Sequence, residues 1–311
     1  MKKLLLLANP VAGITGIGAH LLEVINRLVL GGYEVTVETT QYHGHCKEII
    51  CKKGSDYDTV TVSGGDGTLN EAITALLWLK EEGKNVPKLG YIPAGTVNDF
   101  ARSHDIPTNM PEAASIIASG NLRKCDIGML GDKPFVYVAA FGSFTDTSYG
   151  TPQKLKNIFG KLAYVFHGAS RISTILTPHR MKIEYDNGVI EGDFVYGGAS
   201  NSRSVGGMKL PLKSDVSLDD GKFEVILFKA PSSARKLRKL TEAILTREAD
   251  GYAAYQFSTE WLRITSKDEI PWTTDGEFGG AYRSIELRNV NRAIEIFVPE
   301  KCKYFGDAKS V

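Results

Sequence analysis

The chain has 311 residues, of which 42% are hydrophobic and 23% charged, a balance that is ordinary for a folded protein and excludes bulk disorder. At about 150 residues per domain, this length predicts two domains, each with a sizeable core. The 37 basic and 36 acidic residues leave a net charge of +1, so no global field attracts nucleic acid. We therefore expect no nucleic-acid partner.

The N-terminal leucines resemble a secretory signal but are too few. The run Leu4–Ala8 ends at Asn9-Pro10, short of the apolar core that a signal requires. Elsewhere no apolar run approaches the ~18 residues needed to cross a bilayer. The four cysteines show no paired spacing, which is typical of free thiols in a reducing compartment. We expect a buried first strand and a cytoplasmic protein.

Short strand-like runs alternate with helical patterns over residues 1–128. One helical stripe ends at Gly31-Gly32, and another follows a glycine-rich loop. This alternation predicts an α/β domain with a doubly wound, mainly parallel sheet. The predicted strands are Lys3–Ala8, Glu34–Glu38, Thr59–Ser63 and Leu89–Ile92.

Strand-like runs outnumber helical ones over residues 129–311, and Asp186-Asn187-Gly188 is typical of a hairpin turn. We expect a second, mostly antiparallel, β-sandwich-like domain, interrupted by helices near Pro152–Leu176 and Ser232–Ala249. Its predicted strands are Phe135–Ala140, Met181–Tyr185, Val189–Tyr196, Phe223–Phe228, Leu262–Thr265, Ser284–Leu287 and Ala293–Val298.

A glycine-rich loop, Ser63–Thr68, joins a β-branched strand to an amphipathic helix. Its glycines let backbone N–H groups approach a ligand, and the helix start adds unpaired donors and a positive dipole end. Two more glycine-bearing loops, Asn9–Gly13 and Pro93–Phe100, follow other strands of the same predicted sheet. Any one of them taken singly is also compatible with a plain turn. Because parallel strands end at one edge, the three together predict a polyphosphate site there.

These motifs resemble those of the diacylglycerol kinase catalytic-domain family, in particular the bacterial soluble lipid kinases. The Gly-Gly-Asp-Gly element is shared with NAD kinases and phosphofructokinases, whereas Gly-Thr-x-Asn-Asp-Phe-Ala-Arg is more specific. The resemblance implies that the nucleotide is ATP. It also implies a set of nucleotide-binding residues, in which Thr39 is an alternative to Thr40. The implied nucleotide-binding residues are Asn9, Pro10, Gly13, Thr40, Gly64, Gly65, Asp66, Gly67, Thr68, Leu69, Asn70, Thr96 and Asn98.

Two further matches lie in the second predicted domain. The segment Ser217–Phe223 resembles the family's magnesium loop, which implies a Mg²⁺ ion held by the Asp220 carboxylate and the main-chain carbonyls of Ser217 and Lys222. The segment Asp275-Gly276-Glu277 resembles the family's catalytic element, which implies that Asp275 is the base for a lipid hydroxyl. Taken alone, both segments are also turn signals.

The resemblance implies an ATP-dependent lipid kinase, most simply one that converts diacylglycerol to phosphatidic acid, with residues 300–311 folding back onto the first domain. Other lipid hydroxyls, such as those of sphingoid bases, stay open because acceptor choice depends on pocket shape. An NAD kinase would share the glycine loop, but its Thr-Gly-Ser-Thr-Ala-Tyr-like signature is absent. From a different class, a nucleotide-binding regulator without turnover would share the fold.

A lipid acceptor must be drawn from a membrane surface, so we expect peripheral contact with the inner membrane face. Two predicted helices carry suitable basic residues, which are Lys154, Lys156 and Lys161 in the first and Arg235, Lys236, Arg238 and Lys239 in the second. Each helix is also compatible with an ordinary solvated face. A homodimer is compatible with the sequence, which does not determine the oligomeric state.

Two other patterns carry less weight. The pair Gly16 and Gly18 resembles part of a dinucleotide fingerprint, but Leu21 occupies the third glycine position. A cluster of potential zinc ligands, His43, His45, Cys46 and Cys51, matches no metal template in its spacing. This segment instead predicts the start of a helix.

Overall fold

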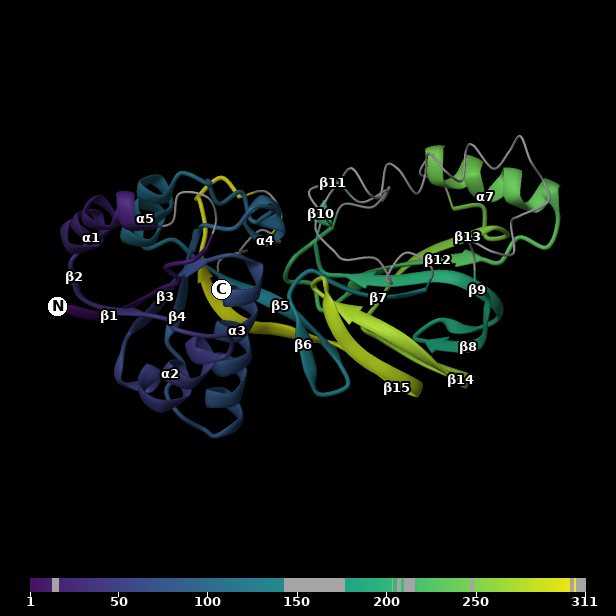
Figure 1. Cartoon of the computed structure of the whole chain (residues 1–311), viewed down its shortest axis with the longest axis horizontal. Coiled ribbons are helices and arrows are strands. Elements are labelled where there is room, and N and C mark those ends of the chain that lie inside the picture. Colours follow the sequence, from purple (N-terminus) through teal and green to yellow (C-terminus); the bar gives the residue numbers. More distant parts are fainter. Residues whose placement is uncertain are drawn as a thin grey trace, which may run out of the picture. The chain divides into compact units, whose positions relative to one another are not determined.

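The computed structural model describes residues 1–12, 17–142, 177–202, 204–205, 208–209, 216–246, 249–302 and 305 (Figure 1). It divides into two compact units. The first contains Met1–Ile127, Leu218–Asp220 and Asn291–Val311, and the second contains Gly128–Ser217 and Gly221–Val290. The predicted helix Pro152–Leu176 lies outside the described residues.

The first unit is built on four parallel strands in the order β2-β1-β3-β4. At the far edge, Ile296 of β15 pairs with Leu89 of β4, also in parallel. The strands are β1 (Lys2–Ala8), β2 (Tyr33–Thr39), β3 (Thr59–Gly64) and β4 (Lys88–Pro93), and β15 is Glu277–Phe297. All four parallel strands were predicted from the sequence to within one residue at each end.

Helices cover both faces of this sheet, with α1 and α5 on one side and α2 and α3 on the other (Figure 1). Strand β1 is therefore buried on both faces from Leu4 onward, and this is why Leu4–Leu7 is an unbroken apolar run rather than an alternating one. The helical segments are η1 (Ile17–Ala19), α1 (Leu21–Leu30), α2 (His45–Lys53), η2 (Gly54–Asp56), α3 (Asp66–Glu81), α4 (Asp99–Ser103) and α5 (Met110–Ser119).

The second unit is an antiparallel β structure whose main strand order is β13-β12-β9-β7-β14-β15. Strand β8 pairs with the first half of both β9 and β14, and β7 pairs with the second half of each. Its remaining elements are β5 (Leu122–Leu130), which begins in the first unit, β6 (Lys133–Phe135), β7 (Val138–Gly142), β8 (His179–Tyr185), β9 (Gly188–Ser200), β10 (Ser204–Val205), β11 (Met208–Lys209), β12 (Phe223–Lys229), α7 (Ala234–Thr246), β13 (Ala254–Thr259) and β14 (Trp261–Thr274).

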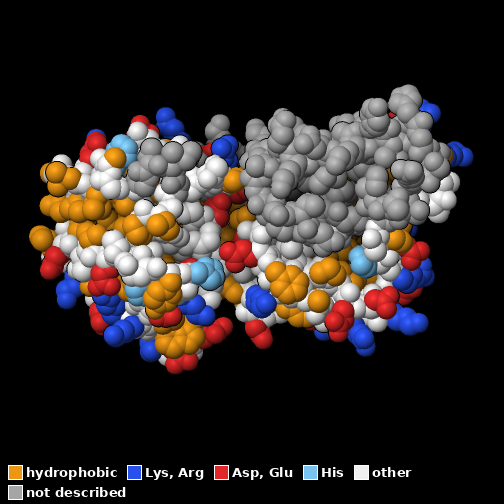
Figure 2. Space-filling model, in the orientation of Figure 1, with side chains coloured by type: hydrophobic (Ala, Val, Ile, Leu, Met, Phe, Trp, Pro, Cys, Tyr) orange, Lys and Arg blue, Asp and Glu red, His pale blue; other side chains and the backbone are white. Residues whose placement is uncertain are grey.

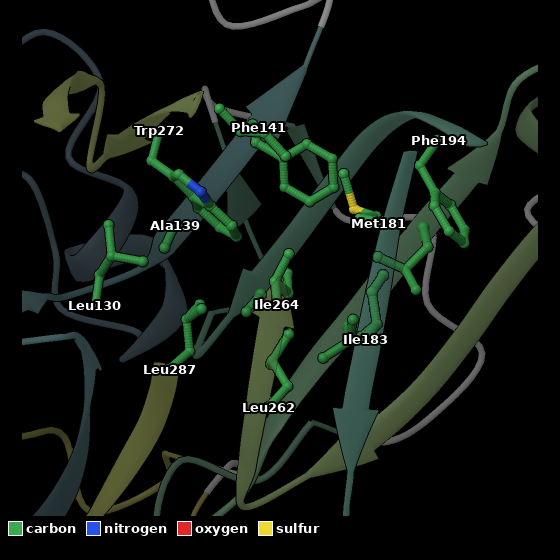
Figure 3. Packing of buried hydrophobic residues seen from close by; sticks show 14 of the residues in the cluster. Leu130, Ala139, Phe141, Met181, Ile183, Phe194, Leu262, Ile264, Trp272 and Leu287 are labelled. Carbon is green, nitrogen blue, oxygen red and sulfur yellow. The ribbon is translucent and has the colours of Figure 1, made fainter. Parts of the chain in front are cut away.

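An aromatic and aliphatic core holds these antiparallel strands together (Figure 3). The rings of Phe141 and Trp272 lie 4.9 Å apart between centroids, and both side chains are fully buried. Branched residues such as Ile183 and Ile264 fill the space beside them. Together, the helix-covered sheet of the first unit and this antiparallel structure confirm the mixed α/β character predicted for the chain.

Charged side chains of both signs are interspersed over the visible surface, as the near-zero net charge leads one to expect (Figure 2). Among the described residues, no helix combines the length and the apolar character needed to span a membrane.

One titratable group, His104, lies fully inside the core of the first unit. Its ring stacks on Phe100 at 3.8 Å between centroids, its Nδ1 lies 2.9 Å from the Phe100 carbonyl oxygen, and its Nε2 lies 3.2 Å from Cys125 Sγ. Burial lowers the pKa of His104 from 6.5 to about 4, because the interior disfavours the charged imidazolium. Folding therefore requires a neutral imidazole here.

This burial predicts a pH-dependent loss of stability. The unfolded chain binds a proton at His104 below pH 6.5, whereas the folded chain does so only below about pH 4. The free energy of unfolding should therefore fall by about 3 kcal/mol through this site as the pH drops across that window. In His104→Phe the decline should be shallower by that amount, while the exposed His20→Phe control should follow the wild type. Urea unfolding at several pH values measures the difference, and parallel curves for His104→Phe and wild type would contradict the assignment.

Candidate active site

The register of the parallel sheet brings four strand ends into line. Ala8 pairs with Thr39 on one side and Ser63 on the other, and Gly64 pairs with Pro93. Backbone bonds of 2.8–3.0 Å continue this alignment into the loops, from Asn9 N to Ser63 O, from Thr40 N to Ala8 O and from Ala94 N to Gly64 O. Four loops therefore begin at one edge, the carboxyl edge of the sheet.

Two of these loops touch each other through their backbones. A Cβ atom added at Gly95 would lie 2.7 Å from Gly65 Cα, and one added at Gly64 would lie 2.5 Å from Thr68 Oγ1. A larger residue at Gly95 would push the two loops apart, and one at Gly64 would displace the Thr68 side chain. Helix α3 begins at Asp66, directly after this contact, so its unpaired N–H groups face the same edge.

The aligned loops enclose a cavity of about 580 Å³, within the range of small-molecule sites. Seven of the predicted nucleotide-binding residues line it, which are Asn9, Pro10, Thr40, Gly65, Gly67, Thr68 and Thr96. The other lining residues, which the prediction did not include, are Val11, Ala12, Gln41, Tyr42, His43, Glu71 and Gly95.

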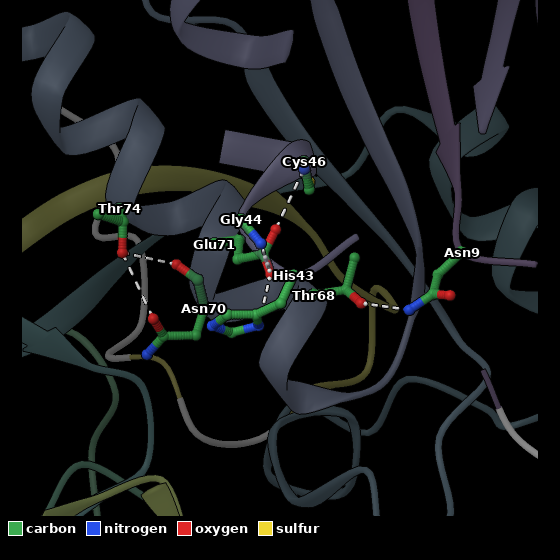
Figure 4. Close-up of polar contacts among 8 residues, drawn as sticks. All are labelled: Asn9, His43, Gly44, Cys46, Thr68, Asn70, Glu71 and Thr74. Carbon is green, nitrogen blue, oxygen red and sulfur yellow. Dashed lines mark hydrogen bonds and ion pairs between the residues drawn. The ribbon is translucent and has the colours of Figure 1, made fainter. Parts of the chain in front are cut away.

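Asn9 connects the first loop to the start of α3. Its Nδ2 donates to Thr68 Oγ1 at 3.2 Å, while its Oδ1 accepts from the Val11 N–H at 3.1 Å (Figure 4). The side chain thus fixes the turn that follows β1 and the position of Thr68 at the same time. Both residues remain on the cavity wall.

Asn98 is one of the predicted nucleotide-binding residues, and in the structure its side chain supports its own loop. It is buried, adopts a left-handed conformation with φ of 54°, and is not among the cavity-lining residues. Its Nδ2 donates to the Gly95 carbonyl at 2.7 Å and its Oδ1 accepts from the Gly95 N–H at 3.0 Å. Tyr91 contributes its hydroxyl at 3.4 Å from the same Oδ1. Asn98 therefore sets the loop that brings Gly95 against Gly65.

Asp66 also connects two loops, since its Oδ2 accepts a hydrogen bond from the Asp99 N–H at 3.1 Å.

Some other predicted residues lie away from the cavity. Leu69 is fully buried in the core, and the Asn70 carbonyl accepts a hydrogen bond from Thr74 at 2.8 Å. The predicted residues that do not line the cavity are Gly64, Asp66, Leu69, Asn70 and Asn98. Gly13 lies outside the described residues.

Glu71 organises the loop between β2 and α2, which forms one wall of the cavity (Figure 4). Its carboxylate accepts from the N–H groups of Gly44 at 2.7 Å and Cys46 at 3.1 Å, and one oxygen lies 3.2 Å from His43 Nδ1. It thereby binds the first N–H groups of α2, where a negative charge is favoured. Glu71 is part of the glycine-rich motif in the sequence. Its position one helical turn after Gly67 could have indicated that its side chain lies beside the cavity.

On the prediction that this cavity binds a nucleotide, Glu71 should influence the affinity through the loop that it fixes. We expect Glu71→Gln to bind ADP about tenfold more weakly, because an amide cannot replace both charge-assisted bonds that fix the loop. Isothermal titration with ADP measures the effect, and Glu81→Gln, an exposed position near the end of the same helix, serves as control. Equal affinities for Glu71→Gln and wild type would contradict this role.

Asp275 lies in the second unit, at the hairpin turn between β14 and β15. Thr274 pairs with Glu277, and the positive φ values of 50° at Asp275 and 87° at Gly276 are those of a two-residue turn. The Asp275 carboxylate accepts three backbone hydrogen bonds of 2.7–3.1 Å, from the N–H groups of Val136, Tyr137 and Val138. Three such donors fix the orientation of the carboxylate.

The predicted magnesium loop lies directly before β12. Asp220 and Lys222 are exposed and Ser217 is partly buried, while Gly221 turns the chain with φ of 82°. The Lys222 carbonyl accepts from Asn289 Nδ2 at 2.8 Å. Among the described residues, no group of three or more His, Cys, Asp or Glu side chains is arranged to hold a metal ion. A site here therefore depends on backbone carbonyls and water in addition to one carboxylate.

Comparison with known proteins assigns the chain to a family. The profile of the diacylglycerol kinase catalytic domain matches residues 3–130. The chain is 31% identical over 310 residues to the diacylglycerol kinase of Bacillus subtilis (strain 168), covering 99% of this chain and all of the relative. It is 32% identical over 299 residues to that of Staphylococcus aureus (strain bovine RF122 / ET3-1), covering 96% and 93%. The chain belongs to the diacylglycerol kinase family. The prediction of a lipid kinase of this family is thereby confirmed.

Solved structures share the fold. A crystal structure of a diacylglycerol kinase from Bacillus anthracis str. Sterne gives a TM-score of 0.74 at 20% identity, covering 97% of this chain and 98% of that one. A second structure from that organism gives a TM-score of 0.79 at 23% identity, with the same coverage. The family member described here therefore has the fold of these kinases over nearly its whole length.

Proposed function

We propose that this family member is a cytoplasmic, ATP-dependent kinase that phosphorylates diacylglycerol to give phosphatidic acid. The observation that carries the proposal is the glycine-lined cavity of about 580 Å³ at the carboxyl edge of the parallel sheet, in a chain whose relatives are named diacylglycerol kinases. On this proposal the first unit is a doubly wound ATP-binding domain, and the second is a β-sandwich-like domain for the lipid.

The phosphates of ATP would lie against Gly65–Thr68. Backbone N–H groups at a helix start bind phosphate oxygens well, and the two glycine positions remove the side chains that would block a close approach. Thr68 and Asn9 present a bonded pair of polar side chains at the same wall. The loop Thr40–His43 would then contact the remainder of the nucleotide.

Asp275 would act as the base for the lipid hydroxyl. Its carboxylate takes the hydroxyl proton as the hydroxyl oxygen forms a bond to the γ-phosphorus, while the bond from that phosphorus to the β–γ bridging oxygen breaks and ADP leaves. The three amide donors around Asp275 would hold its carboxylate in a fixed orientation for this step.

Magnesium would be held by the Asp220 carboxylate and the carbonyls of Ser217 and Lys222. These are the hard oxygen donors that Mg²⁺ prefers, with water completing its coordination. A carbonyl oxygen has two lone pairs, so the hydrogen bond that Lys222 accepts from Asn289 is compatible with this second role. When bound there, the ion supplies positive charge that orders the loop before β12.

Two alternatives are separable by assay. An NAD kinase would form NADP from ATP and NAD, and a nucleotide-binding regulator would bind ATP without magnesium-dependent consumption across a lipid panel. The same panel, containing diacylglycerol, monoacylglycerol and a sphingoid base, identifies the acceptor.

The oligomeric state is a separate question. A homodimer stays a prediction, which ultracentrifugation tests directly.

The role of Asp275 is tested by Asp275→Asn. We expect phosphorylation of diacylglycerol to fall at least a hundredfold, since general base catalysis typically contributes that much, while ADP affinity stays at the wild-type value. Asp268→Asn, an exposed carboxylate on the same strand pair, is the matched control. Circular dichroism checks the fold, and Asp275→Glu, which keeps the charge but moves it, provides a second variant. A folded Asp275→Asn enzyme with the wild-type rate would refute the proposed role.

A further inference from the structure

One wall of the cavity in the first unit contains an exposed aromatic ring that the protein holds in place. Tyr42 lines the cavity and is 57% exposed. Its ring stacks on the imidazole of His45, with 4.6 Å between the centroids and 16° between the planes. Its hydroxyl donates to Glu48 Oε2 at 2.7 Å. Because one face and the hydroxyl are already bound, the ring has little conformational freedom left to lose when a ligand binds.

The residue that supports this ring is itself fixed. His45 is partly buried at the start of α2, and its Nδ1 accepts from the Gln41 N–H at 3.1 Å. Its own N–H donates to the Tyr42 carbonyl at 3.2 Å. Gly44 lies between them with φ of 89°, a value that favours glycine and lets the chain turn tightly. The stacked pair therefore belongs to one closed turn.

The position of this turn along α3 relates it to the proposed phosphate site. Glu71 accepts from the N–H groups of Gly44 and Cys46 and so anchors the turn to the helix (Figure 4). Glu71 follows Gly67 by one helical turn, which is about 6 Å along the axis. A nucleotide with its phosphates against Gly65–Thr68 would thus extend its ribose and base along the wall that contains Tyr42.

Several hydrogen-bond donors of this wall are already used by the protein. The Gln41 side-chain Nε2 donates to the carbonyl and the hydroxyl oxygen of Thr39, at 3.2 Å and 2.9 Å. The backbone N–H groups that donate within the turn or to Glu71 are those of Gln41, Gly44, His45 and Cys46. These groups are not available to read the edge of a base, whereas the ring of Tyr42 is available to its face.

We propose that Tyr42, supported by His45, is the platform on which the purine base of the nucleotide stacks. The inference rests on the proposed function in one respect, namely that the cavity binds a nucleotide. Stacking recognises the flat face that all bases have, so the contact should serve adenine and guanine alike. Tyr42 thus contributes to the affinity for the base and leaves the affinity for the phosphates unchanged.

The test compares ligands with and without a base, by isothermal titration of the full chain with ADP, GDP and inorganic triphosphate. Tyr42→Ala should bind ADP and GDP about thirtyfold more weakly than wild type, since stacking of a base on an aromatic ring typically contributes that much. Its affinity for inorganic triphosphate should stay within about twofold of wild type, because that ligand has no base.

Two further variants separate the ring from other properties of the residue. Tyr42→Phe keeps the ring and loses the hydrogen bond to Glu48, so it should bind all three ligands within about threefold of wild type. Tyr252→Ala removes a tyrosine of similar exposure that is not among the cavity-lining residues, and it should bind as wild type does. Circular dichroism checks the fold of each variant.

Three results would overturn the stacking platform. One is wild-type ADP affinity in Tyr42→Ala, and another is an ADP affinity in Tyr42→Phe as low as that in Tyr42→Ala. The third is an equal loss of ADP and inorganic triphosphate binding in Tyr42→Ala, which would mean that the substitution deforms the cavity as a whole.

Kinase assays separate this proposal from the proposed function. A wild-type protein that binds ADP through Tyr42 but transfers no phosphate to diacylglycerol would refute the function and leave the platform standing. A kinase that is active on diacylglycerol, and whose KM for ATP is the same in Tyr42→Ala as in wild type, would overturn the platform and leave the function standing.

Discussion

The cavity of the first unit depends on a backbone contact between two glycines. The loop after β3 and the loop after β4 approach so closely at Gly65 and Gly95 that a single methyl group would lie 2.7 Å from the opposite Cα atom. This approach is possible because parallel register ends β3 and β4 at the same level, with Gly64 opposite Pro93. The start of α3 is thereby presented to the cavity with its N–H donors unobstructed.

Polar side chains around the cavity mainly hold the loops, and the backbone is left to meet a ligand. Asn98 folds back on Gly95, Glu71 binds the first turn of α2, and Asn9 ties its loop to Thr68. Such preorganisation reduces the entropy that binding would otherwise cost.

The sequence was most informative where local patterns coincide with the fold. The four parallel strands of the first unit are rich in apolar or β-branched residues, so their limits were readable to within one residue. Strand β13 was missed, because its residues Ala254–Thr259 show little apolar alternation. Two runs predicted as separate strands, Ser284–Leu287 and Ala293–Val298, proved to belong to the single strand β15, which pairs with β14 as far as Arg288 and with β4 at Ile296.

For the site residues, too, the sequence predicted the location better than the role of each side chain. Motif glycines and the polar residues next to them indicated the cavity edge, but sequence spacing cannot tell which side chains face a ligand and which support a loop. Asn98 therefore looked like a ligand contact, although its amide is engaged by Gly95. Tyr42 and His43 were missed as cavity-lining residues because they reach the cavity through the tertiary contact of their loop with Glu71.

Titration of ADP into Gly95→Ala tests the central claim most directly, with Gly18→Ala as the control because a Cβ atom there meets nothing within 4 Å. The account predicts that Gly95→Ala stays folded but binds ADP at least tenfold more weakly, while Gly18→Ala binds as wild type does. Wild-type affinity in a folded Gly95→Ala protein would show that the glycine contact does not build the nucleotide site.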